Sequence, residues 1–242
     1  MNYTESTWNE FRRIDFIFED REAILVFPNE ENKTPKWMLK TEYFGAFPSL
    51  EIDMLKEGYH LAYVKNRSRI ATDDDMLLKR KFADFLHDEF GLYRKCVCIG
   101  MSYGGYHAVN FASRYPSYIS LLYLDAPLLS FFGTTPGFES EESFHVEQMN
   151  AMGYTSMSEL YVDSDQPIHR LKTLTDNMLP VALVYGDADR VVDYRKNSVV
   201  LYDYYNLKGA PIGIWCKPGC DHHPHGPVDN KEVIDFIKKH EL

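Results

Sequence analysis

Residues 95–108, KCVCIGMSYGGYHA, decide the fold. The first five are mostly apolar and typical of β-strands, the hexapeptide GMSYGG at 100–105 follows, and a helix-compatible segment comes next. This pattern predicts a strand, a sharp turn and a helix, with Ser102 at the apex of the turn. Small residues at Gly100 and Gly104 would let the strand and helix backbones approach closely.

The turn has two interpretations. A G-x-S-x-G turn can hold its serine in a strained backbone conformation with the hydroxyl projecting from the sheet, which is a nucleophile elbow. Alternatively, Ser102 only caps the helix of an ordinary glycine-rich turn. The position of the motif between an apolar strand and a helix favours the elbow.

Length and composition narrow the class of protein. A chain of 242 residues is long enough to form one α/β domain over 1–242, and 45% hydrophobic and 14% aromatic residues are typical of a globular fold. The 36 acidic and 26 basic residues give a net charge of −10. This charge disfavours nucleic acid or an anionic membrane surface as a partner. A small-molecule substrate is expected, and nothing in the sequence indicates an oligomeric state.

The sequence also gives an expectation for the compartment. The first residues, MNYTESTWNEF, contain no basic segment followed by an apolar run, and no later stretch has the roughly eighteen apolar residues of a membrane span. We therefore expect a cytoplasmic protein with no membrane association. In a reducing compartment cysteines remain free thiols. The sequence has four of them: Cys96, Cys98, Cys216 and Cys220.

Strand and helix patterns alternate along the chain. Strand patterns occur at 11–18, 23–27, 60–64, 95–99, 119–124, 181–185 and 212–216, and helix patterns occur at 49–57, 73–90, 106–113, 194–205 and 228–239. This alternation predicts an α/β fold with a mostly parallel central sheet flanked by helices. Ligands of such folds bind beyond the carboxyl ends of the strands.

Residues 128–175 depart from the alternation. They carry four phenylalanines among Gly, Pro, Ser and Glu residues: Phe131, Phe132, Phe138 and Phe144. The position of this stretch downstream of the elbow predicts a small lid or cap insertion. The phenylalanines would either line a substrate pocket or form a small core that holds the insertion in place.

A nucleophilic serine needs a base, and the base needs an orienting acid. The strand at 181–185 is followed by GDADRVV at 186–192, which contains Asp187 and Asp189. The strand at 212–216 is followed by KPGCDHHPH at 217–225, which contains three histidines. The chain order Ser, Asp, His is the order expected when the serine lies on a strand-to-helix elbow.

On these motifs the sequence resembles the α/β-hydrolases, over essentially the whole chain apart from the insertion. GMSYGG matches the elbow, and the GDADRVV and DHHPH segments resemble the esterase and prolyl-oligopeptidase-like branches. By the G-x-x-D spacing of those branches, the resemblance implies that Asp189 is the acid and Asp187 a turn residue. Asp125 ends another strand, which houses the acid in some hydrolases.

The resemblance implies that His222 is the base, because the base commonly follows a small residue directly after the turn. Here Asp221 stands where the family commonly has glycine, so His223 and His225 remain alternatives. The histidines, together with Cys220, could instead bind zinc. Pro224 is expected to limit how far three closely spaced histidines converge.

These residues predict a serine hydrolase that cleaves a carboxylic ester of a small substrate through an acyl-enzyme, with catalytic residues Ser102, Asp189 and His222 and with no cofactor or metal. The oxyanion would be held by the backbone N–H of Tyr103 and by one from residues 28–37, for which Trp37 is the candidate. Alternatives are a thioesterase or peptidase of the same fold, or a catalytically silent hydrolase fold that binds a ligand.

Overall fold

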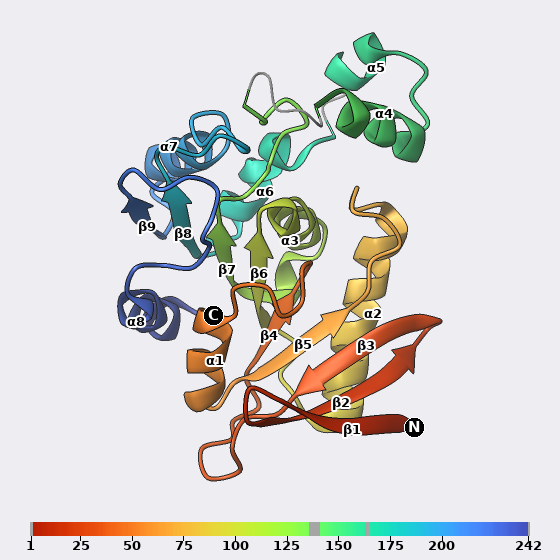
Figure 1. The fold of residues 1–242 in the computed structure, drawn as a ribbon, viewed down its shortest axis with the longest axis vertical. Coiled ribbons are helices and arrows are strands. Elements are labelled where there is room, and N and C mark those ends of the chain that lie inside the picture. The colour runs from red at the N-terminus through yellow and green to blue at the C-terminus, as the bar shows by residue number, and fades with distance from the viewer. Residues whose placement is uncertain (1, 136–140, 163–164, 242) are drawn as a thin grey trace.

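A central β-sheet organises the structure, a computed structural model that describes residues 2–135, 141–162 and 165–241 (Figure 1). The side chains at 141, 142 and 144 are also outside the description, so the predicted roles of Phe138 and Phe144 concern side chains that the structure does not describe. The sheet has nine strands within the described residues: β1 Tyr3–Trp8, β2 Phe11–Phe18, β3 Arg21–Val26, β4 Trp37–Lys40, β5 His60–Val64, β6 Cys96–Met101, β7 Ile119–Asp125, β8 Val181–Gly186 and β9 Ile212–Lys217.

The strand order is β1-β2-β3-β5-β4-β6-β7-β8-β9. Strands β1, β2, β3 and β5 pair antiparallel, whereas every pairing from β5 through β4 to β9 is parallel. The predicted mostly parallel sheet is therefore confirmed. Two strands had no clear signal in the sequence, because five of the six residues of β1 are exposed and β4 has only four residues.

Helices cover both faces of the sheet (Figure 1). Leu50, Met54, Val233 and Ile237 belong to one core cluster, and Phe82, Val109 and Leu201 belong to the other. Helices α1 and α8 therefore pack on one face, and α2, α3 and α7 pack on the other. Their bounds are α1 Ser49–Lys56, α2 Asp73–Phe90, α3 Tyr103–Arg114, α7 Ser198–Lys208 and α8 Asn230–His240.

Two helices begin later than the apolar pattern predicted. Helix α7 begins at Ser198 instead of 194. The residue before it, Asn197, contacts the insertion, because its side-chain Oδ1 accepts the Leu129 N–H at 2.7 Å. Helix α8 begins at Asn230, because the Asp229 carboxylate caps it by accepting the Lys231 N–H at 2.8 Å.

The stretch between β7 and β8 contains helices that the weak periodicity of the sequence did not predict. They are α4 Glu141–Met152, α5 Met157–Val162, η2 Pro167–Arg170 and α6 Leu171–Asp176. Helices α4 and α5 lie on the side of the molecule toward which β6 and β7 point (Figure 1). Phe131 is buried and stacks on Tyr106 of α3 with ring centroids 5.1 Å apart, which favours the core interpretation for this phenylalanine.

The sequence also carries expectations about the cysteines and about membrane-spanning helices. All four cysteines are free, and Cys96 and Cys98 lie buried in the same core cluster. In the part of the chain that the structure describes, no helix combines the length and the apolar character that a membrane crossing requires.

Glycines allow α3 to pack directly against its surroundings. A Cβ added to Gly100 of β6 would lie 2.7 Å from the Gly105 Cα, and one added to Gly105 would lie 2.4 Å from the Cβ of Pro127. Both distances are far shorter than van der Waals contact. The absence of side chains at these two positions therefore sets how closely α3 approaches β6 and the segment after β7.

We predict that Gly105→Ala lowers the free energy of unfolding by about 1–3 kcal/mol, because the new methyl group overlaps Pro127 in a region without free volume. Gly104→Ala is the matched control, since a Cβ there would be 3.1 Å from its nearest neighbour, the Thr41 Oγ1. Urea unfolding of both variants tests the prediction. A loss no larger for Gly105→Ala than for Gly104→Ala would contradict it.

Candidate active site

Ser102 occupies a strained turn between β6 and α3. Its φ of 51° and ψ of −120° lie in a region that L-residues rarely adopt. The Ser102 N–H donates to the Asp125 carbonyl at 2.9 Å, and the Ser102 carbonyl accepts the Leu128 N–H at 2.9 Å. The Ser102 side chain makes no capping hydrogen bond to α3. The geometry therefore matches the elbow and not the capping alternative.

The Ser102 hydroxyl lies 2.9 Å from Nε2 of His222. On the other side of the ring, Nδ1 of His222 lies 2.8 Å from Oδ2 of Asp189, and both of these side chains are at least 95% buried. The second carboxylate oxygen of Asp189 accepts the backbone N–H groups of Val191 and Val192 at 2.8 and 2.9 Å. These contacts hold the carboxylate toward the imidazole, and the imidazole toward the hydroxyl.

The loops that follow β8 and β9 are joined by two further carboxylates. Asp187 accepts the Gly219 N–H at 2.6 Å. Asp221 accepts the backbone N–H groups of Arg190 and His222, both at 2.8 Å, and forms an ion pair with the Arg190 side chain. The backbone N–H groups of Arg190 and His222, together with the Arg190 guanidinium, lower the pKa of Asp221 to about 2. Asp221, where the resemblance predicts glycine, thus connects the loop at 187–192 after β8, the acid loop, to the loop at 218–226 after β9, the histidine loop.

A second buried pair anchors the histidine loop to the elbow. Nδ1 of His225 lies 3.3 Å from Oδ1 of Asp125, and Oδ2 of Asp125 accepts the Gly226 N–H at 2.5 Å and the Tyr123 hydroxyl at 3.2 Å. Burial alone would raise the pKa of Asp125, but its contacts with His225 and Gly226 outweigh burial and lower it. The backbone carbonyl of Asp125 also accepts the Ser102 N–H. Asp125 therefore connects the histidine loop to the elbow.

Tyr103, the first predicted oxyanion donor, directly follows Ser102. It is the first residue of α3, so its backbone N–H lies at the positively polarised end of the helix. The structure does not bring Trp37 to the site. Trp37 begins β4 one residue before Met38, which pairs with Val97, so it lies about six residues, or roughly 20 Å, from the level of Ser102.

Residues that follow the carboxyl end of β4, and not Trp37 at its start, lie beside the elbow. Thr41 follows β4, and its hydroxyl lies 2.8 Å from the carbonyls of both Ile99 and Gly104. A Cβ added to Gly104 would lie 3.6 Å from the backbone nitrogen of Glu42. The pattern of residues 28–37 does not locate the end of the loop, because β4 has only four residues and is too short to be recognised from the sequence.

A charged contact connects the insertion to the elbow. The Nε of Arg69, in the segment between β5 and α2, donates to Glu147 of α4 at 2.8 Å. The same guanidinium lies 5.6 Å from the ring centroid of Tyr103. Helix α4 is therefore held close to the first residue of α3.

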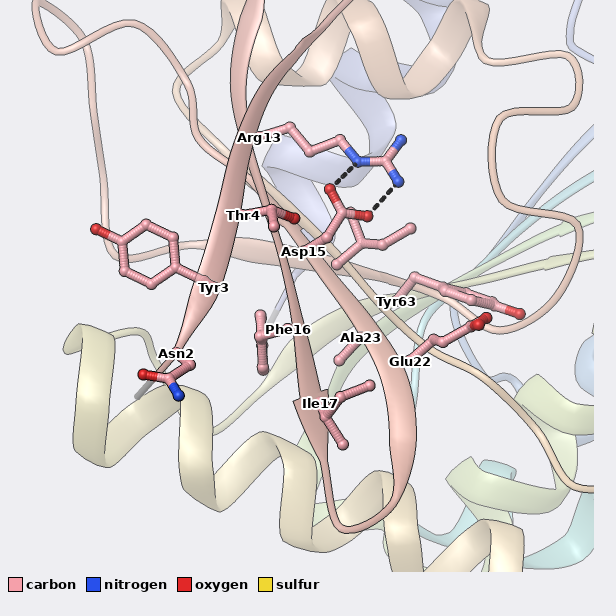
Figure 2. A pocket seen from close by; sticks show the side chains of 11 residues that line it. Asn2, Tyr3, Thr4, Arg13, Asp15, Phe16, Ile17, Glu22, Ala23 and Tyr63 are labelled. Atoms are coloured by element: carbon pink, nitrogen blue, oxygen red, sulfur yellow. Dashed lines mark hydrogen bonds and ion pairs between the residues drawn. The ribbon is translucent and has the colours of Figure 1, made fainter.

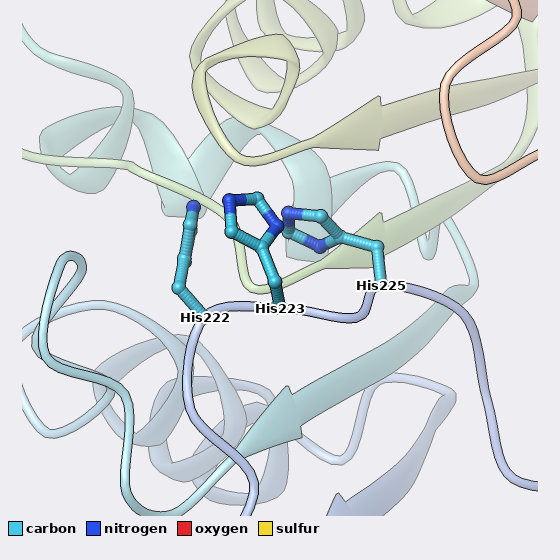
Figure 3. Close-up of side chains that lie close together, drawn as sticks. All are labelled: His222, His223 and His225. Carbon is cyan, nitrogen blue, oxygen red and sulfur yellow. The ribbon is translucent and has the colours of Figure 1, made fainter.

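His222, His223 and His225 converge although Pro224 interrupts them (Figure 3). The nitrogen atoms that these rings could offer to a metal lie within 4.8 Å of one another. Pro224 therefore does not prevent the three rings from lying side by side, although their nitrogens are spread more widely than the ligands of a bound zinc ion. His222 and His225 are buried and His223 is exposed.

A separate hollow of about 530 Å³ lies on the antiparallel part of the sheet (Figure 2). Its lining includes Tyr3 of β1, Ile17 of β2 and Tyr63 of β5, and two of its charged residues, Arg13 and Asp15, bond each other at 2.8 Å. None of the residues that line it belongs to the loops that carry Ser102, Asp189 and His222.

No family model and no curated protein matches this sequence. Solved structures do match the fold. The acylaminoacyl peptidase of Pyrococcus horikoshii matches with a TM-score of 0.69 and 16% identity over 100% of this chain and 42% of that chain. The dipeptidyl peptidase 4 of Porphyromonas gingivalis matches with a TM-score of 0.68 and 15% identity over 98% of this chain and 36% of that chain.

The S-formylglutathione hydrolase of Agrobacterium tumefaciens matches with a TM-score of 0.62 and 10% identity over 99% of this chain and 97% of that chain. The chain thus spans well under half of the two peptidase chains and nearly all of the hydrolase chain. At such low identities the likeness establishes the fold. The predicted α/β-hydrolase fold is confirmed.

We predict that Asp125→Asn lowers the free energy of unfolding by about 1–3 kcal/mol, because an amide cannot accept from both His225 and Gly226 and leaves a buried donor unpaired. Asp187→Asn is the control, since its carboxyl is exposed and the amide oxygen can still accept the Gly219 N–H. Urea unfolding compares the two variants. Equal losses would show that the buried pair does not anchor the loop.

Proposed function

We propose that this chain is a serine hydrolase that cleaves a carboxylic ester of a small substrate. The observation that carries the proposal is the continuous chain of contacts from Ser102 through His222 to Asp189, at 2.9 and 2.8 Å. A nucleophile, a base and an orienting acid at these distances are what acyl transfer requires.

In the first step, Nε2 of His222 takes the proton of Ser102 while Oγ attacks the ester carbonyl carbon. The carbonyl π electrons move to oxygen, and this oxyanion accepts the N–H of Tyr103 and the N–H of Glu42, which follows β4 beside the elbow. His222 then protonates the departing alcohol, which leaves an acyl group on Ser102. Asp189 holds the proton on Nδ1, so that Nε2 is free to accept, and stabilises the imidazolium.

In the second step, His222 removes a proton from water, and the resulting hydroxide attacks the acyl carbon. The tetrahedral intermediate collapses, the bond to Ser102 Oγ breaks, and His222 returns its proton to the serine. The products are a carboxylic acid and the free enzyme. Every proton transfer uses the same ring nitrogen, so the cycle needs no group beyond those that surround Ser102.

The insertion would act as the lid in this proposal. The Arg69–Glu147 contact holds α4 near Tyr103, and thus beside the place where the acyl group would be bound. An ester is favoured over an amide as substrate because an alcohol departs more readily than an amine. The near-complete match to the length of the A. tumefaciens S-formylglutathione hydrolase also supports a small acyl substrate with a good leaving group, and the thiolate that its named substrate would release keeps the thioesterase alternative beside the ester.

We predict that Ser102→Ala and His222→Ala each lower kcat for a short p-nitrophenyl ester by at least about a thousandfold, because each removes a member of one catalytic unit. Ser113→Ala, which removes a buried serine from the last turn of the same helix, should retain activity near that of wild type. Initial rates at 400 nm measure the effect, and circular dichroism confirms folding. A folded wild type that neither hydrolyses the ester nor reacts with a fluorophosphonate would favour the silent ligand-binding alternative.

Ester and amide preference can be measured on one acyl group. We predict a kcat/KM at least about a hundredfold higher for the alkyl ester than for the amide, because resonance makes the amide carbonyl less electrophilic and its nitrogen a poorer leaving group, while His222 donates the proton to either one. Product formation is followed by chromatography, with Ser102→Ala as the blank. Amide cleavage at a comparable kcat/KM would favour the peptidase alternative, and the matching thioester distinguishes a thioesterase.

A further inference from the structure

The histidine loop places three imidazoles side by side. Figure 3 shows the rings of His222, His223 and His225 projecting from the same side of the loop. Their centroids are 4.8–5.0 Å apart in each pair, and their ligand nitrogens all lie within 4.8 Å of one another. Ester hydrolysis by the proposed mechanism uses only His222, so the other two rings have no assigned part in it.

His222 and His225 each contact a carboxylate, as metal-binding histidines commonly do. Nδ1 of His222 is bonded to Asp189 at 2.8 Å, and Nδ1 of His225 lies 3.3 Å from Asp125. Histidine ligands in metalloproteins commonly place one ring nitrogen on a carboxylate, which orients the other nitrogen and makes it more basic. Both Nε2 atoms are thereby directed away from the carboxylates, and the two buried negative charges favour a cation between the rings.

His223 completes the group and is accessible from solvent. Its ring stacks on Phe47 with centroids 5.4 Å apart and an interplanar angle of 12°, and Phe47 also packs edge-on against His225 at 5.3 Å. Phe47 therefore restrains the two rings relative to each other. Because His223 is exposed while its neighbours are buried, an ion from solvent would meet this ring first.

The donor set suits zinc. Imidazole nitrogens bind Zn²⁺ at about 2.0–2.1 Å, which places tetrahedral ligands about 3.4 Å apart. The ligand nitrogens, which lie within 4.8 Å of one another, therefore need to approach by up to about 1.4 Å when zinc is bound. Three histidines leave a fourth position for water. Mg²⁺ and Ca²⁺ prefer oxygen ligands and would not be bound.

We propose that His222, His223 and His225 form a Zn²⁺ site, and that zinc bound there inhibits the enzyme. The zinc ion takes the Nε2 lone pair of His222, so this atom no longer accepts the proton of Ser102, and the hydroxyl remains a poor nucleophile. The inhibition rests on the proposed function, whereas the zinc site itself does not. The inhibition is reversible, because a chelator that removes zinc returns Nε2 to Ser102.

Zinc titrations of wild type, His223→Gln and His240→Gln test the proposal. Calorimetry measures binding, and ester hydrolysis measures inhibition, with each protein normalised to its own metal-free rate. We expect one zinc per wild-type chain, a half-inhibitory concentration at least about tenfold higher in His223→Gln since a three-histidine site loses one ligand, and no change in His240→Gln, whose histidine packs on Phe236 outside the cluster. EDTA should restore activity, and Mg²⁺ should neither bind nor inhibit.

Equal binding by wild type and His223→Gln would overturn the proposal, as would binding by wild type without loss of activity. The same calorimetry on Ser102→Ala separates the site from the proposed function, since this variant keeps all three histidines but lacks the nucleophile. Zinc binding to Ser102→Ala that is lost in the double variant with His223→Gln supports the site even if wild type hydrolyses no ester. In that case the hydrolase assignment fails and the metal site stands.

Discussion

The close approach of α3 to β6 is the constraint on which the rest of the site depends. Gly100 and Gly105 face each other with no room for a side chain, and Gly105 also abuts Pro127. This packing forces the chain to turn within one residue, and Ser102 takes the strained conformation that results. The strain is tolerated because backbone bonds to Asp125 and Leu128 hold the turn on both sides. The hydroxyl is thereby directed out of the sheet before any catalytic partner is considered.

The order of the parallel strands brings His222 and Asp189 close to Ser102. β6, β7, β8 and β9 are consecutive neighbours, so the loops at their carboxyl ends form one continuous rim. Carboxylates join three of these loops: Asp125 at the end of β7 accepts from the loop after β9, and Asp187 and Asp221 connect the loops after β8 and β9. His222 lies inside this set of cross-links. Its ring is thus restrained from both neighbouring loops as well as by Asp189.

The same arrangement gives the histidine loop two potential uses. A base that must accept a proton and a ligand that must bind a metal both need an imidazole with one nitrogen held by a carboxylate and the other exposed to a reactant. Asp189 and Asp125 provide this support to His222 and His225 on one short loop. Exposed His223 adds the third ring without a carboxylate of its own among its described contacts, which makes it the residue by which proton transfer and metal binding can be separated.

The sequence by itself determined the α/β alternation, the elbow at residues 100–105 and the order of serine, acid and histidine, because these depend on local patterns of apolar residues, glycines and turns. Tertiary structure alone decided the rest. Trp37 lies at the wrong end of a strand too short to recognise. Asp125 depends on a partner 100 residues away along the chain, and Asp221 depends on one 31 residues away. The convergence of three histidines across Pro224 also depends on contacts with Phe47, Asp125 and Asp189 from distant segments. No spacing along the chain encodes such contacts, since they arise only when the strand ends are brought to one rim.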